Sequence, residues 1–207
     1  VDVSGSMSTC KAEMMGMLQR ILRWLQARKK KVLIVGFDHQ LHWLLLRRHA
    51  ESGRMTTRIR QQTTSMGEYF SGAATSTLRA AEPPPAAAQP VACADLREAD
   101  MQRIARTVTG WIANGGTFGA PALATVAAWL NACGAGAPAD IIFVTDGSDG
   151  GDKASPQSRR AFFRRLSHRR SPPSLGVQRG IEEQRGIEEL RAGGHTILPV
   201  GLGKGVD

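Results

Sequence analysis

The chain begins with a segment, Val1–Met7, that combines the pattern of a buried strand with three oxygen-bearing side chains. Two valines flank Asp2, as expected where a β-strand is covered by other residues. Gly5 lets the backbone turn sharply out of that strand. A strand that ends in this way and runs into a helix brings the oxygens of Asp2, Ser4 and Ser6 to one point above a sheet. Hard cations such as Mg²⁺ prefer oxygen ligands, so the segment predicts a metal site at the end of a strand.

Length and composition indicate how many domains can carry that site. With 207 residues, of which 42% are hydrophobic, the chain is long enough for one substantial α/β domain and short for two. We therefore expect a single domain over residues 1–207. Because the chain opens within a strand and ends just after another, we expect it to be cut at both ends. No apolar run in the sequence approaches the ~18 residues of a membrane span.

The three cysteines, Cys10, Cys93 and Cys133, are odd in number and widely spaced. This pattern favours free thiols in a reducing compartment over a disulfide framework. Without a Cys-x-x-Cys pair, a zinc site is not indicated. Because free thiols indicate a reducing compartment, we expect a cytoplasmic location.

Three long segments show the three- and four-residue spacing of apolar side chains that predicts an amphipathic helix. They cover residues 11–30, 95–113 and 121–133. A short tandem repeat, Arg-Gly-Ile-Glu-Glu twice over residues 179–189, predicts a fourth helix. That helix is expected to end at Gly193-Gly194, since glycine favours helix C-termini.

Three apolar runs, at residues 32–37, 140–147 and 195–200, predict strands. Residues 41–46 predict another strand, which should form an antiparallel hairpin with the first because the link between them is short. Strands that alternate with helices predict an α/β fold. We expect a Rossmann-like, doubly wound and mostly parallel sheet, with one antiparallel edge strand and helices on both faces.

Residues 47–94 have little hydrophobic periodicity. Arg, Thr, Ser and Gly dominate the first part, and residues 80–90 are rich in Ala and Pro. We expect a poorly packed insertion that contains at most one short helix and ends in a flexible Pro/Ala-rich linker.

The order of three motifs along the chain gives the predicted metal site a more definite interpretation. Asp-x-Ser-x-Ser, a Gly-Gly-Thr loop and a Thr-Asp-Gly turn after a later strand supply Asp2, Ser4, Ser6, Thr117, Asp146 and Gly147. This set resembles the von Willebrand factor A domain with its metal-ion-dependent adhesion site. The resemblance extends over nearly the whole chain, and the chain looks like a prokaryotic, intracellular member of that family.

The resemblance implies a ligand set and a function. Asp2, Ser4, Ser6, Thr117 and Asp146 would bind a divalent cation, Mg²⁺ or Mn²⁺, with the aspartates acting directly or through water. One coordination position would stay open for an Asp or Glu of a partner protein. Intracellular members of this family often work beside AAA-type ATPases. The resemblance thus implies a protein-binding module and no enzymatic activity.

Two other functions stay open. The formal net charge is +9, and six arginines lie in one short segment, Arg159–Arg170. A solvated helix face, an acidic partner or a nucleic acid would each suit that segment. A metal-dependent hydrolase would instead need a general base near the ion, and Asp149 and Asp152 are the nearby candidates.

Several of these residues could have a simpler structural role instead of binding a metal. Ser4 and Ser6 could cap the helix that begins near Lys11, because serine is a favoured N-cap residue. His39 and His42 could bind a metal from one face of the predicted hairpin. Without a further convergent ligand, we expect them to be exposed polar residues instead.

Overall fold

The structure is a computed structural model, and it describes residues 1–51, 54–65, 83–112, 116, 119–132, 138–146 and 187–202. Several predictions fall outside these residues. They concern Thr117, Gly147, Asp149, Asp152 and the Arg159–Arg170 segment.

The helices lie close to the positions that the apolar spacing predicts. A 3₁₀ helix, η1 (Gly5–Cys10), leads directly into α1 (Lys11–Ala27), and another, η2 (Cys93–Asp95), precedes α2 (Glu98–Gly110). α3 spans Gly119–Ala132, and residues 187–192 are also helical. Gly194 has a φ of 79°, and the His195 N–H donates to the Leu190 carbonyl at 3.0 Å. The predicted glycine end of that helix is therefore confirmed.

The strands form three hydrogen-bonded groups. β2 (Val35–Phe37), β3 (Gln40–Glu51) and β4 (Arg54–Ser65) are successively antiparallel. β6 (Asp140–Thr145) and β7 (Thr196–Gly201) are parallel. β1 (Lys31–Val32) pairs antiparallel with β5 (Val91–Ala92). The antiparallel hairpin predicted after residues 32–37 is confirmed, although that run is divided between β1 and β2.

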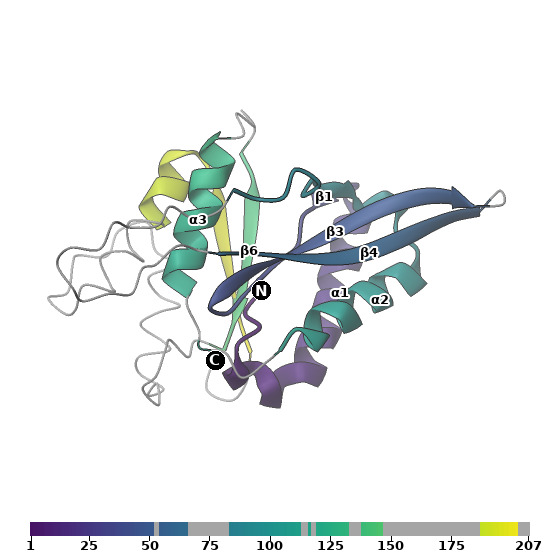
Figure 1. Cartoon of the computed structure of the whole chain (residues 1–207), viewed down its shortest axis with the longest axis horizontal. Coiled ribbons are helices and arrows are strands. Elements are labelled where there is room, and N and C mark those ends of the chain that lie inside the picture. Colours follow the sequence, from purple (N-terminus) through teal and green to yellow (C-terminus); the bar gives the residue numbers. More distant parts are fainter. Residues whose placement is uncertain are drawn as a thin grey trace, which may run out of the picture.

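We predicted a poorly packed insertion from residue 47 onward. For residues 47–51 and 54–65 this prediction is wrong, because they form strands. β3 continues to Glu51 and pairs along its whole length with β4, so β3 is not the edge strand that we expected. Figure 1 shows the two strands as one long ribbon pair whose far end projects beyond α1 and α2. The sequence pattern did not predict this hairpin because most described side chains of β4 are exposed and polar. Cross-strand pairing with β3 stabilises it instead.

Residues 1–3 connect two of the strand groups. The Phe37 N–H donates to the Val1 carbonyl and the Val3 N–H to the Phe37 carbonyl, both at 2.9 Å, in a parallel bridge. On the other side, the Asp2 N–H donates to the Val144 carbonyl at 2.7 Å. The N-terminal segment therefore lies between β2 and β6 (Figure 1).

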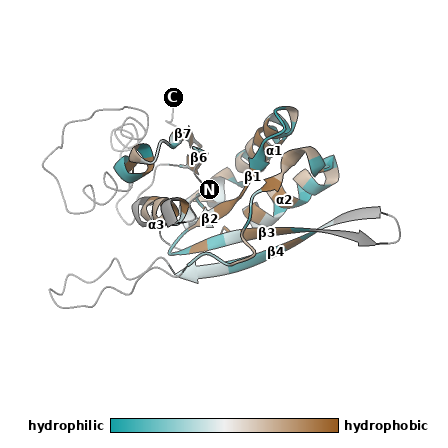
Figure 2. Ribbon diagram, turned by 90° about the horizontal axis from the view of Figure 1, so that it is seen from above, coloured by the Kyte–Doolittle hydropathy of each residue, from teal (hydrophilic) through white to brown (hydrophobic). Residues whose placement is uncertain are grey.

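Two hydrophobic clusters cover opposite faces of these strands. Leu44 and Val144 belong to a cluster with α1 and α2, whereas their neighbours Trp43 and Phe143 pack with α3 and residues 187–192. Successive strand residues point to opposite faces, so helices lie on both sides of the strands. Figure 2 shows this arrangement, with α3 on one side and α1 and α2 on the other.

The fold is thus mixed α/β, as predicted. Parallel pairing among the described residues is limited to β6 with β7 and the bridge between Asp2 and Phe37. None of the helices in the described part of the chain is long and apolar enough to cross a membrane.

Close packing around Gly36 gives a prediction for stability. A Cβ atom there would lie 2.9 Å from Cε3 of Trp111 and 3.2 Å from Cγ1 of Val3. We expect Gly36→Ala to lower the free energy of unfolding by about 1–3 kcal/mol, because the indole and the N-terminal segment must move. Urea denaturation measures this change.

Gly16→Ala is the matched control. No atom lies within 4 Å of a Cβ placed at Gly16, which is inside α1. Alanine there should be neutral or stabilising by up to ~1 kcal/mol, since glycine is a poor helix former. Equal effects of the two substitutions would contradict the packing at Gly36.

Candidate metal centre

Asp2 lies at the centre of the predicted site and is completely buried. Its Oδ1 accepts the Ser4 N–H at 2.9 Å, and its Oδ2 accepts the Thr145 hydroxyl at 2.7 Å. Burial raises the pKa of Asp2, hydrogen bonds from Ser4 and Thr145 act in the opposite direction, and the charge of Asp146 raises it further. Both carboxylate oxygens are therefore fixed by donors from two different parts of the chain.

The hydroxyls of Ser4 and Ser6 lie side by side, with their Oγ atoms 2.9 Å apart. Ser4 is completely buried and has extended backbone (φ −67°, ψ 168°), whereas Ser6 is exposed in the first turn of η1. The Ser4 side chain makes no capping hydrogen bond, and α1 begins only after Cys10. The alternative in which these serines cap the long helix is therefore wrong.

The separation of the two hydroxyls suits a small divalent cation. Mg²⁺ binds oxygens at about 2.0–2.1 Å in an octahedral shell, which places adjacent ligands roughly 2.9 Å apart. The Ser4 and Ser6 Oγ atoms, which form a hydrogen bond with each other, are also 2.9 Å apart. Asp2 accepts hydrogen bonds from both the backbone and the side chain of Ser4 and from the Thr145 hydroxyl.

Asp146 is the second carboxylate of the predicted set. It follows β6 directly, is buried, and lies near enough to Asp2 for its charge to raise the pKa of that residue. Two buried carboxylates that repel one another favour a cation between or beside them. Hydrogen bonds thus join Asp2, Ser4 and Ser6, and Asp146 lies close enough for its charge to affect the pKa of Asp2. Thr117 lies outside the described residues.

Within the described ranges, no three His, Cys, Asp or Glu side chains gather as potential metal ligands.

Thr145 is a site residue that the sequence analysis missed. Its hydroxyl spans from β6 to the N-terminal segment and orients the Asp2 carboxylate. It is the threonine of the Thr-Asp-Gly motif, but of that motif only Asp146 was among the predicted ligands. A polar residue just before Asp146 at a buried strand end was the available signal.

Asp38 is a buried acid that the motifs did not indicate. Its Oδ1 accepts the Gln40 N–H at 2.8 Å and lies 3.0 Å from Nε2 of His42. Desolvation raises the pKa of Asp38, but the hydrogen bonds from His42 and Gln40, with the charges of His42 and His39, lower it overall. Asp38 therefore holds the turn between β2 and β3.

The environment of His42 corrects an expectation. His42 is buried, stacks on Trp111 with 5.9 Å between ring centroids, and has its Nδ1 2.9 Å from the Gln61 side-chain nitrogen. Only His39 is an exposed polar residue, as expected. Both ring nitrogens of His42 have partners within the hairpin, Asp38 and Gln61. The stacking on Trp111, the residue that follows α2, connects the hairpin to that helix.

Comparisons of the chain with protein-family models, curated proteins and solved structures found no match. The interpretation of the site consequently depends on its own geometry.

The Thr145 hydroxyl gives a second testable prediction. Thr145→Val keeps the shape of the side chain but removes the donor to Asp2, leaving a buried carboxylate less well satisfied. We expect a loss of about 1–3 kcal/mol in the free energy of unfolding at neutral pH. Thr145→Ser keeps the hydroxyl and should retain most of the stability. If valine and serine have the same effect in denaturant titrations, the hydrogen bond does not support the site.

Proposed function

We propose that this chain is a divalent-metal-dependent protein-binding module of the von Willebrand factor A type. The observation that carries the proposal is the gathering of the Ser4 and Ser6 hydroxyls, which are hydrogen-bonded to each other, beside a completely buried aspartate that has a second buried acid near it. Asp2, Ser4, Ser6, Thr117 and Asp146 are the proposed ligands, with Mg²⁺ or Mn²⁺ as the ion.

The proposal includes a fold. Residues 1–3 bond to β2 on one side and β6 on the other, which suggests the strand order β4, β3, β2, residues 1–3, β6, β7. We propose that these strands act as one Rossmann-like, doubly wound sheet. In such sheets ligands bind at the carboxyl ends of the strands, where Asp2 and Asp146 both lie.

The chemistry of the site favours an acidic partner. The hydroxyls of Ser4 and Ser6 are neutral, and hydrogen bonds from Ser4 and Thr145 reduce the negative charge that Asp2 presents. A divalent ion held in this way remains electrophilic and would accept a further carboxylate. The residues of this chain thus orient the ion, and an Asp or Glu of a partner protein completes its coordination.

The identity of the partner and its setting are further parts of the proposal. The resemblance suggests an AAA-type ATPase system and a cytoplasmic location. The free thiols of Cys10 and Cys93, both buried, are compatible with a reducing compartment.

Calorimetric titration with Mg²⁺ and Mn²⁺ tests the proposed site. We expect the wild-type chain to bind one ion, and Ser4→Ala and Ser6→Ala each to weaken binding about tenfold or more, because each removes a ligand. Asp146→Asn should also weaken binding.

Ser8→Ala is the matched control, since Ser8 is an exposed serine in the same 3₁₀ helix as Ser6. It should bind the ion as the wild type does. Equal affinity of Ser4→Ala and Ser8→Ala, with both variants folded by circular dichroism, would show that the hydroxyls are not ligands.

A second candidate function, nucleic-acid binding, gains support from a group of arginines on the hairpin. Arg47 stands directly opposite Arg58 in the β3–β4 register, and Arg60 follows on the same face. These three residues line a hollow of about 360 Å³ together with Leu45, Gln61, Gln62 and Ala87. A phosphate in this hollow would lie among three arginine side chains, which suits an anion.

Fluorescence anisotropy with a labelled single-stranded oligonucleotide tests this alternative. If the hairpin binds phosphates, replacing Arg47 and Arg60 together by Gln should reduce the slope of log affinity against log salt by about 1.4, or ~0.7 per lost contact. Arg20→Gln on α1 removes an exposed charge elsewhere and serves as the comparison. A double variant that binds like Arg20→Gln would exclude the hairpin as the binding surface.

A further inference from the structure

Trp111 packs against both the β2–β3 hairpin and the N-terminal segment that carries proposed metal ligands. A Cβ atom at Gly36 would lie 2.9 Å from Cε3 of Trp111 and 3.2 Å from Cγ1 of Val3, so the indole and the valine lie against the same glycine. Trp111 and Val3 belong to one hydrophobic cluster, in which Val3 is completely buried. Val3 lies between Asp2 and Ser4 in the chain, so the indole packs against the residue that joins these two proposed ligands.

His42 supports the indole from the hairpin. It stands opposite Gly36 in the β2–β3 register, and its ring stacks on Trp111 with an interplanar angle of 25°. Because glycine has no side chain, the indole can approach the Gly36 backbone closely and contact the His42 ring at the same time. Gly36 and His42 together therefore form the surface against which Trp111 fits.

The His42 ring is held in one orientation by hydrogen bonds at both nitrogens. Its Nε2 lies 3.0 Å from Oδ1 of Asp38, and the Gln61 amide nitrogen lies 2.9 Å from its Nδ1. An ionised carboxylate only accepts hydrogen bonds and an amide nitrogen only donates them, so the neutral ring carries its proton on Nε2. An apolar side chain could fill the same volume, but it would have no hydrogen bonds to fix its plane. The two polar partners thus fix the plane on which Trp111 stacks.

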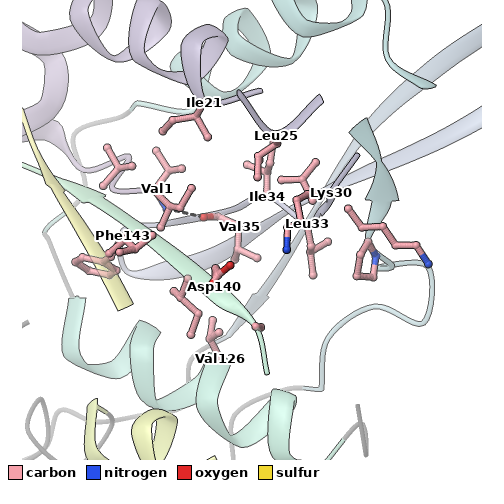
Figure 3. Close-up of a pocket in the computed structure, with 18 of the residues that line it drawn as sticks. Val1, Ile21, Leu25, Lys30, Leu33, Ile34, Val35, Val126, Asp140 and Phe143 are labelled. Carbon is pink, nitrogen blue, oxygen red and sulfur yellow. Dashed lines mark hydrogen bonds between the residues drawn. The ribbon is translucent and has the colours of Figure 1, made fainter. Parts of the chain in front are cut away.

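The packing of Val3 does more to place the N-terminal segment than that of Val1. Figure 3 shows Val1 beside Val35 of β2, and the Val1 amino group donates to the Val35 carbonyl at 2.7 Å. The Val1 side chain, however, borders an apolar cavity of about 380 Å³, whereas Val3 is completely buried. Side chains beside a cavity lack contacts on one side. The neighbours of Val3, Trp111 among them, are therefore the better support of the segment.

We propose that His42 and Trp111 are positioning residues for the metal site. The hairpin orients the imidazole, the imidazole supports the indole, and the indole holds Val3 against β2. Asp2 and Ser4 thereby keep the hydrogen bond from the Ser4 N–H to the Asp2 carboxylate. The effect of this support on ion binding rests on the proposed function, whereas its effect on the hydrogen bond does not require a metal.

Hydrogen exchange of the metal-free protein tests this positioning. The Ser4 N–H donates to Oδ1 of Asp2, and its exchange rate is measured by NMR with EDTA present. We expect Trp111→Leu to accelerate exchange of this amide about tenfold or more, because Val3 loses its support and the hydrogen bond opens more often. Trp111→Phe keeps an aromatic ring and should restore most of the protection.

Two surface variants test the role of His42 without a change in the core. Gln61→Leu removes the donor to the His42 ring, and Gln62→Leu is the matched control, since both glutamines are exposed neighbours on β4. Gln61→Leu should accelerate Ser4 amide exchange about threefold, and Gln62→Leu should leave it unchanged, with both variants folded by circular dichroism. Equal exchange rates in these two variants, or in Trp111→Leu and Trp111→Phe, would overturn the proposal.

Titration with Mn²⁺ separates this proposal from the proposed function. We expect Trp111→Leu to bind the ion about tenfold more weakly than the wild type, and Trp111→Phe to bind it nearly as well. A wild-type chain that binds no Mn²⁺ would contradict the proposed metal site, while the exchange rates of the Ser4 amide would still decide whether Trp111 positions the segment. Faster exchange in Trp111→Leu with unchanged Mn²⁺ affinity would show that the support does not serve the site.

Discussion

The backbone hydrogen bonds of residues 1–3 are the constraint on which the rest of the structure depends. Within the described part of the chain, β2-β3-β4 and β6-β7 share no ladder of their own, and Phe37 and Val144 are joined through this segment. The same bonds place Asp2 between the ends of β2 and β6. Because Val3 packs with α1 and α2 beneath them, the segment also contributes to the larger hydrophobic cluster. These three residues thus contribute to the contacts between strand groups, to the core and to the candidate site together.

The sequence predicted the elements whose apolar residues repeat and missed those held by pairing alone. α1 and α2 carry stripes such as Met14, Leu18 and Leu22, and the buried faces match these stripes. β4 has no such stripe, because its partner β3 provides its hydrogen bonds and most of its described side chains face solvent. The sequence did not indicate the break between β1 and β2 either. β1 pairs with β5, a strand of only two residues that leaves no recognisable pattern. Strand partners that are distant in sequence leave little trace in local composition.

The candidate site was predictable to the extent that it is local. Asp2, Ser4 and Ser6 are two residues apart, so the turn after the strand brings them together without help from the remaining fold. The proximity of Asp146 required two strands to end at one edge, which the alternation of helices and strands suggested. The roles of Thr145 and Asp38 could not be anticipated in the same way. Thr145 depends on its hydrogen bond to Asp2, and Asp38 on its contacts with Gln40 and His42; packing of the surrounding strands sets the geometry of each.

The proposed function and the stability of the fold are linked through Asp2. This carboxylate is completely buried next to a second buried acid, and burial and repulsion both raise its pKa. Donors from Ser4 and Thr145 offset part of that unfavourable free energy. A divalent cation would offset more of it, and because the site assembles only when residues 1–3 lie between β2 and β6, the ion would bind the folded state in preference to the unfolded one. An ion at this site would therefore strengthen the same strand contacts that create its ligand geometry.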